Sequence, residues 1–153
     1  MKEIQSNINI IGGGLIGVAT AYSLSKLGNK VVVLEQNAKF NHKNILDKRT
    51  TAISEGTKRF LEEINVWNEI GNYAEPIKNI QIIDRNQSNK IYFDNQRRKS
   101  NLGYIVKNEF ILDCLYKKLQ KQKNVKIFNN VSIKDIFYQG DRIITKKNNF
   151  YVN

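Results

Sequence analysis

Residues 7–35 read NINIIGGGLIGVATAYSLSKLGNKVVVLE, and this stretch decides the fold. An apolar strand leads into Gly12-x-Gly14-x-x-Gly17, an amphipathic helix follows, and a second apolar strand ends at an acidic residue. This order of strand, glycine turn, helix, strand and acid is typical of the βαβ units that bind dinucleotides. A glycine-rich turn without a ligand is the alternative interpretation.

The small residues of this stretch each have a mechanical reason. Gly12 allows a tight turn out of the strand, Gly14 lets the backbone approach a pyrophosphate, and Gly17 lets the helix lie close to the sheet. Ala21 keeps the helix near the first strand, and Gly28 is expected to end the helix as a left-handed cap. The spacing therefore predicts that the N–H groups of the helix N-terminus face phosphates.

Glu35 stands at the C-terminal end of the second strand. A carboxylate at this position accepts hydrogen bonds from the ribose hydroxyls of an adenosine. It also disfavours a 2′-phosphate, because two negative groups would face each other. The sequence thus predicts an adenosine dinucleotide without a 2′-phosphate.

Length and composition limit the classes of protein that need to be considered. The chain has 153 residues, 41% of them hydrophobic, which suits about one domain with a core. It has no run of 18 apolar residues and no N-terminal signal arrangement, so a cytoplasmic protein without a transmembrane helix is expected. The single Cys114 excludes an internal disulfide, and the single His42 disfavours zinc and Ser-His-Asp chemistry. Any chemistry is therefore expected to come from a cofactor.

The formal net charge of +11 comes from scattered lysines rather than from one basic run. Asparagine and isoleucine are abundant as well, which is the residue usage of an AT-rich coding sequence. The charge is therefore interpreted as a solvated basic face, and no nucleic-acid partner is expected. Weak attraction to an anionic membrane surface is the second interpretation. It would place the protein at the periphery of the inner membrane and suit a lipid substrate.

Hydrophobic periodicity and turn residues predict the remaining elements. A start near Ser54 or Thr51 is expected for the second helix. Helices are expected over residues 15–27, 50–64, 66–70 and 108–122. Strands are expected over residues 7–11, 30–34, 77–85, 90–94, 103–106, 125–128, 131–138, 142–145 and 149–152.

Three downstream segments carry a resemblance to a known family. They are DKRTTAIS at residues 47–54, AEPI at residues 74–77 and LGYIVKN at residues 102–108. With these segments the whole chain resembles the N-terminal part of the ubiquinone-biosynthesis hydroxylases, which are FAD-dependent aromatic monooxygenases related to p-hydroxybenzoate hydroxylase. The resemblance implies that the glycine turn binds FAD rather than a nicotinamide dinucleotide.

The resemblance also implies a fold. It is an α/β, Rossmann-like FAD-binding fold, with a parallel sheet, helices on both faces and a β-meander crossover, joined to part of an antiparallel substrate sheet. Residues 1–75 would form the FAD-binding βαβ unit and the following helices. Residues 76–106 would form part of the substrate sheet, and residues 107–153 would return to the FAD-binding domain.

The implied reaction is hydroxylation of a polyprenylated phenol, with FAD as cofactor and NAD(P)H as reductant. The protein would hold the flavin, exclude water and orient the ring, so no catalytic side chain and no metal site are predicted. Tyr92, Phe93 and Tyr104 are candidates to line an apolar substrate pocket, and simple core packing is the alternative.

The family's cofactor residues transfer to six positions. Gly12, Gly14 and Gly17 would hold the FAD pyrophosphate, and Glu35 the adenosine ribose. The other two positions are Arg49 and Asn108.

Arg49 and Asn108 each have a structural alternative. Arg49 matches an arginine that reaches the cofactor, and the alternative is a surface arginine that caps the next helix. Asn108 matches an amide that contacts the flavin chain, and the alternative is plain N-capping. Lys107 departs from the acid often found just before that amide.

Family members continue into Asp-Gly and Gly-Asp motifs that bind the flavin half, and this sequence stops at Asn153 before both. The fold is therefore expected to be incomplete, with residues 7–11 as an unpaired apolar edge that a chain carrying the C-terminal half could complete. Three hypotheses follow: the N-terminal part of a monooxygenase, a non-catalytic remnant or partner-completed FAD-binding module, and an NAD-dependent oxidoreductase.

Overall fold

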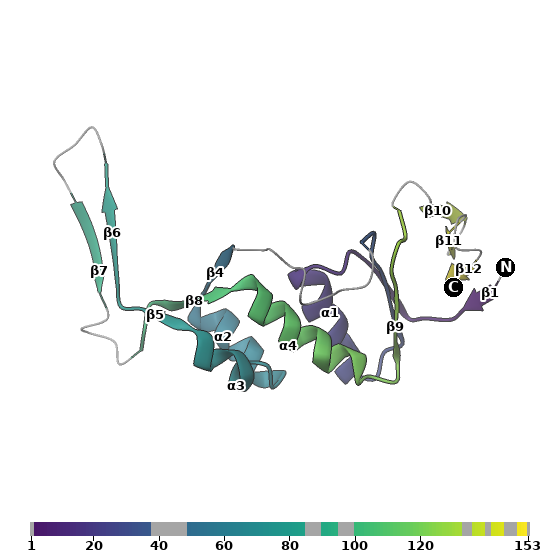
Figure 1. The fold of residues 1–153 in the computed structure, drawn as a ribbon, viewed down its shortest axis with the longest axis horizontal. Helices are drawn as coiled ribbons and strands as arrows, with labels where there is room; N and C mark the ends of the chain where they lie inside the picture. Colours follow the sequence, from purple (N-terminus) through teal and green to yellow (C-terminus); the bar gives the residue numbers. More distant parts are fainter. Residues whose placement is uncertain are drawn as a thin grey trace. The chain divides into compact units, whose positions relative to one another are not determined.

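The computed structural model describes residues 2–37, 49–84, 90–94, 100–132, 136–139, 142–145 and 150–152. The chain divides into two compact units, one formed by residues 1–46 with 112–153 and the other by residues 47–111 (Figure 1). The predicted three-part division of the chain stays a prediction.

The first unit is built on a parallel sheet in the order β2-β3-β9. Its strands are β2 (Ile8–Ile11), β3 (Val31–Leu34) and β9 (Val125–Phe128). Every residue of β3 is at most 1% exposed, as expected for a central strand that is covered on both faces. In the described part of the chain β2 is an outer strand that pairs with β3 alone.

Helix α1 (Leu15–Lys26) connects β2 to β3 and packs against both strands. It buries Val18 and Ala21 completely. Gly28 follows the helix with φ +87°, and its N–H donates to the carbonyl of Ser25 at 3.0 Å, so the predicted left-handed cap is confirmed. The side-chain amide of Asn124 donates to the same Ser25 carbonyl at 2.8 Å, which ties the end of α1 to the start of β9.

A second sheet covers the face of β3 to which Val32 and Leu34 point. Its order is β1-β12-β11-β10, and its strands are β1 (Lys2–Ile4), β12 (Phe150–Val152), β11 (Arg142–Thr145) and β10 (Ile136–Gln139). The two sheets share an apolar core made of Ile4, Val32, Leu34, Val131, Ile143 and Val152. The predicted meander is confirmed, whereas β1 was not predicted.

One expected meander strand is shorter than predicted. The strand expected over residues 131–138 begins only at Ile136 among the described residues. The reason is that the N–H of Val131 donates to the carbonyl of Glu35 at 2.9 Å instead of joining the meander.

The second unit contains an antiparallel sheet in the order β4-β8-β5. Its elements are β4 (Thr50–Ile53), α2 (Glu55–Glu63), α3 (Trp67–Ile70), the 3-10 turn η2 (Gly71–Tyr73), β5 (Glu75–Ile77) and β8 (Gly103–Lys107). The prediction of a helix over residues 50–64 is wrong for the first turn. Residues Thr50–Ile53 pair with β8 because threonine and isoleucine suit a strand, and the helix starts after Ser54. The Ser54 hydroxyl oxygen accepts from the N–H of Thr57 at 3.2 Å, so Ser54 is the N-cap.

A hairpin of β6 (Asn79–Ile83) and β7 (Lys90–Asp94) extends from the β5 and β8 end of this unit (Figure 1). The strand expected over residues 77–85 is thus divided between β5 and β6. All ten residues of its two strands are exposed. The pairs Ile80–Phe93 and Ile82–Ile91 lie on one face because alternate residues share a face, so this face is entirely apolar.

Helix α4 (Asn108–Gln120) leads from the second unit back into the first. Its buried face carries Ile111, Leu112, Cys114, Leu115, Tyr116 and Leu119. The helix ends two residues before the predicted limit. Among the described helices, none has the length and apolar character needed to cross a membrane.

Candidate functional site

The glycine turn lies between the carboxyl end of β2 and the N-terminus of α1. Gly12 has φ +106°, a conformation that requires glycine in practice, and its N–H donates to the carbonyl of Leu34 at 2.8 Å. A Cβ on Gly17 would overlap the carbonyl oxygen of Gly12. The prediction attributed Gly17 to close packing of helix and sheet, and the structure shows that its tightest neighbour is the turn itself.

Gly14 is the N-cap of α1, and its surroundings differ from those of Gly17. A Cβ on Gly14 would have no atom within 4 Å. The helix has no side-chain cap and no acidic residue in its first turn. The space beside Gly14 and the N-terminal N–H groups of α1 are compatible with a pyrophosphate, and this role of the glycine turn stays a prediction.

Glu35 is only 5% exposed, and protein donors engage both of its carboxylate oxygens. Oε2 accepts from the N–H of Gly13 at 2.5 Å. Oε1 accepts from the backbone N–H of Asn37 at 2.8 Å and from its side-chain amide at 2.7 Å. Glu35 therefore fastens the glycine turn to the end of β3. Each carboxylate oxygen has two lone pairs, so a contact with ribose remains compatible and stays a prediction.

Two residues of this site were missed by sequence reasoning, namely Gly13 and Tyr116. A Cβ on Gly13 would lie 2.9 Å from Oε2 of Glu35 and 2.9 Å from the hydroxyl oxygen of Tyr116. Burial and the negative charge of Glu35 raise the pKa of Tyr116 to about 12. The run of three glycines hinted at Gly13, whereas Tyr116 looked like any residue on the buried face of α4.

Arg49 and Asn108 lie together in the second unit. The N–H of Asn108 donates to the carbonyl of Arg49 at 3.0 Å, and the Thr51 hydroxyl donates to Oδ1 of Asn108 at 2.6 Å. Asn108 is buried and is the first residue of α4, so its side chain connects α4 to β4. Arg49 is exposed. The roles of these two residues toward a cofactor stay predictions.

The aromatic residues suggested for a substrate pocket do not act together in the hairpin. Tyr92 and Phe93 are neighbours on β7 and so point to opposite faces, which means that they cannot line one pocket on this strand. Tyr104 packs instead against Trp67, with ring centroids 4.9 Å apart in an edge-to-face arrangement.

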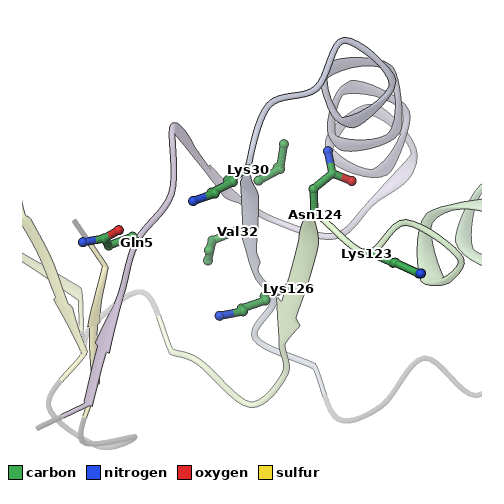
Figure 2. Close-up of a pocket in the computed structure, with 7 residues that line it drawn as sticks. Gln5, Lys30, Val32, Lys123, Asn124 and Lys126 are labelled. Atoms are coloured by element: carbon green, nitrogen blue, oxygen red, sulfur yellow. The ribbon is translucent and has the colours of Figure 1, made fainter.

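A cavity of about 400 Å³ lies elsewhere in the first unit, and Figure 2 shows the residues that line it. It lies at the amino ends of β3 and β9, whereas ligands of open α/β sheets bind beyond the carboxyl ends. Among the described strands β9 is an outer strand, and its exposed Lys126 lies beside Val32. Lysines on outer strands protect sheet edges from pairing. The cavity is therefore not the dinucleotide site. Its lining residues are Gln5, Lys30, Val31, Val32, Lys123, Asn124 and Lys126.

Comparison with known proteins supports the flavin interpretation of the glycine turn. A family model described as "FAD binding domain" matches residues 5–142. The Drosophila melanogaster protein "Ubiquinone biosynthesis monooxygenase COQ6, mitochondrial" is 30% identical over 135 residues, which is 83% of this chain and 28% of that protein. The Escherichia coli (strain K12) protein "3-demethoxyubiquinol 3-hydroxylase" is 26% identical over 128 residues, which is 82% of this chain and 33% of that protein.

The fold itself resembles that of a solved monooxygenase structure. The crystal structure of p-nitrophenol 4-monooxygenase PnpA from Pseudomonas putida DLL-E4 matches with a TM-score of 0.73 and 22% identity, covering 94% of this chain and 36% of that one. At this identity the likeness concerns the fold alone. The predicted resemblance and α/β fold class are confirmed, and the chain spans about a third or less of the length of these relatives.

Proposed function

Because this chain belongs to the FAD-binding domain family, we propose that it forms the adenosine-diphosphate-binding part of an aromatic-ring monooxygenase. The proposed reaction is hydroxylation of a polyprenylated phenol in ubiquinone biosynthesis, with NAD(P)H as the reductant. The observation that carries this proposal is the open space at Gly14 beside an uncapped helix N-terminus, in a chain whose relatives are ubiquinone hydroxylases.

The residues of the first unit would hold the adenosine-diphosphate part of FAD. The N–H groups at the start of α1 would bind the pyrophosphate, and Gly14 would let it approach the backbone. Glu35 would face the adenosine ribose. When bound, FAD supplies the redox chemistry that activates oxygen, while the protein binds and orients it.

The remainder of the proposed enzyme would come from residues outside those described. The outer position of β2, with Ile11 exposed at its end, suits pairing with a further parallel strand from a complementing chain. The apolar face of the β6–β7 hairpin suits contact with a prenyl chain. The net charge of +11 suits a protein at the cytoplasmic periphery of the inner membrane.

Side-by-side titration of the chain with FAD and NADH tests the cofactor. We expect FAD to bind more tightly and ADP to compete with it, because the site fits the adenosine-diphosphate part. Tighter binding of NADH would favour the NAD-dependent oxidoreductase instead. Binding of FAD without hydroxylation when a complementing chain is supplied would favour the non-catalytic module.

Gly14→Val tests the pyrophosphate position directly. The new side chain meets no protein atom near its Cβ, so α1 should form as before, yet it fills the space that a pyrophosphate needs. We expect at least a roughly tenfold loss of FAD affinity, which is about 1.4 kcal/mol, with an unchanged thermal melt. Gly56→Ala, at an open position in α2, is the control and should leave FAD binding unchanged. Wild-type affinity in Gly14→Val would refute the proposed site.

A further inference from the structure

Two buried oxygen atoms converge on one side of Gly13. Oε2 of Glu35 and the hydroxyl oxygen of Tyr116 both lie 2.9 Å from the point where a Gly13 Cβ would stand. Glu35 follows β3 and Tyr116 belongs to α4, so residues far apart in the sequence meet beneath the glycine turn. The absence of a side chain on Gly13 makes this meeting possible.

The Glu35 carboxylate is held in one orientation by its surroundings. Gly13 donates to one oxygen, and Asn37 donates twice to the other. Tyr116 is only 2% exposed and stands on the Gly13 side of the carboxylate. A buried carboxylate needs polar neighbours to offset the loss of hydration, and the Tyr116 hydroxyl oxygen lies beside Gly13 on the same side as Oε2.

The hydroxyl stays protonated at neutral pH. Burial raises the pKa of Tyr116, and so does the negative charge of Glu35, to about 12. A protonated phenol presents a positive O–H dipole, whereas a phenolate would repel the carboxylate. The raised pKa therefore keeps Tyr116 in its phenol form over the physiological range.

We propose that Tyr116 is a positioning residue that fixes the Glu35 carboxylate toward Gly13 and thereby aims the one remaining lone pair of Oε2 at a ribose hydroxyl. This inference rests on the proposed function, in which Glu35 faces the adenosine ribose. It adds that discrimination between a ribose and a 2′-deoxyribose depends on Tyr116, which makes no contact with the ligand in this scheme.

The test uses ADP and 2′-deoxy-ADP as ligands of the full chain, with their Kd values measured by calorimetry. The wild-type chain should prefer ADP by about tenfold, the size expected for one hydrogen bond to a charged group. Glu35→Gln should reduce this preference to about twofold or less. Tyr116→Phe, which removes one oxygen and keeps the ring, should reduce it to about threefold.

The double variant separates the positioning role from general packing. If Tyr116 acts through Glu35, Tyr116→Phe should have no further effect on the preference in the Glu35→Gln background. Tyr22→Phe is the matched control, because Tyr22 is a buried tyrosine of the same unit, in α1. It should leave the preference at the wild-type value. Thermal melts check that each variant is folded.

The outcomes distinguish the ribose role of Glu35 from the positioning role of Tyr116. An unchanged preference in Glu35→Gln would refute the ribose role of Glu35 and with it the proposed site. A collapsed preference in Glu35→Gln with a wild-type preference in Tyr116→Phe would refute only the positioning role. An equal effect of Tyr116→Phe in both backgrounds would also refute it, because Tyr116 would then act independently of Glu35.

Gly13→Ala provides a second, independent variant. Its Cβ would push aside both oxygens without removing either of them. We expect the ADP preference to fall toward the Glu35→Gln value. A wild-type preference in this variant would contradict the proposed geometry.

Discussion

Strand β3 and the strands of the β6–β7 hairpin are all rich in apolar residues but have opposite environments. Val31–Leu34 is at most 1% exposed throughout, whereas Ile82 is 50% exposed and Tyr92 66% exposed. β3 has a strand on each side and apolar cover on both faces. Within the described residues, each hairpin strand pairs only with the other.

The difference shows how far the local sequence determines whether a strand is buried. A continuous apolar run such as VVVL predicts burial on both faces, and β3 confirms it. The hairpin alternates instead, with a polar face on which the Gln81 amide donates to the Tyr92 hydroxyl at 2.9 Å. Its apolar face needs a cover that local sequence does not supply, since two strands alone are marginally stable in water.

Gly17→Ala should give the largest effect, because it acts on the turn that orders the β2-β3-β9 unit. The new methyl group would overlap the Gly12 carbonyl oxygen, and this backbone atom cannot move without opening the turn. We expect a loss of about 3 kcal/mol or more in the free energy of unfolding, measured by urea denaturation. Gly56→Ala should be neutral or slightly stabilising. Equal stabilities of the two variants would show that the turn does not govern this unit.

The alkaline stability of the chain should depend on Tyr116. Its pKa is raised to about 12 in the folded chain, from 10.0 as the ordinary value. Because the folded pKa is the higher one, the contribution of Tyr116 is fully present below pH 10 and is lost as the pH rises from 10 to about 12. Over this pH window the free energy of unfolding of the wild-type chain should fall by about 2 to 3 kcal/mol more than that of Tyr116→Phe. Denaturant unfolding at each pH measures the stability of both proteins. Equal losses of stability in the two would contradict the buried environment of Tyr116.

A matched pair of substitutions compares the two strands directly. Val33→Thr buries a hydroxyl in β3 and should cost about 1 to 3 kcal/mol. Ile82→Thr acts on the exposed apolar face of the hairpin and should change the free energy of unfolding by less than about 0.5 kcal/mol. It should also raise solubility, measured as the protein left in solution after centrifugation. A cost at Ile82 equal to that at Val33 would show that the hairpin face is covered in solution.

Short-range patterns predicted most elements but not those made by distant pairing. Strands β7, β9 and β11 match their predicted bounds, because alternation or a continuous apolar run marks them. The three residues of β1 were missed, since they become a strand only by pairing with Phe150–Val152. Thr50–Ile53 was assigned to a helix for the same reason, because its partner β8 lies about fifty residues later.

The residues of the candidate site also differ in whether their local sequence could identify them. Gly12, Gly14 and Gly17 could be identified from spacing, because each satisfies a need of the local backbone. Arg49 and Asn108 were found by resemblance alone, and the structure shows them joined to each other in the second unit.

The sequence by itself determined the strand, turn, helix and strand of residues 7–35, together with the family, because those features depend on neighbours a few residues apart. The tertiary structure decided that Glu35 turns back to the N–H of Gly13 and that Tyr116 stands beside it. Such a meeting depends on how α4 packs in the first unit, and helical periodicity gives the buried face of α4 without saying what that face will contact.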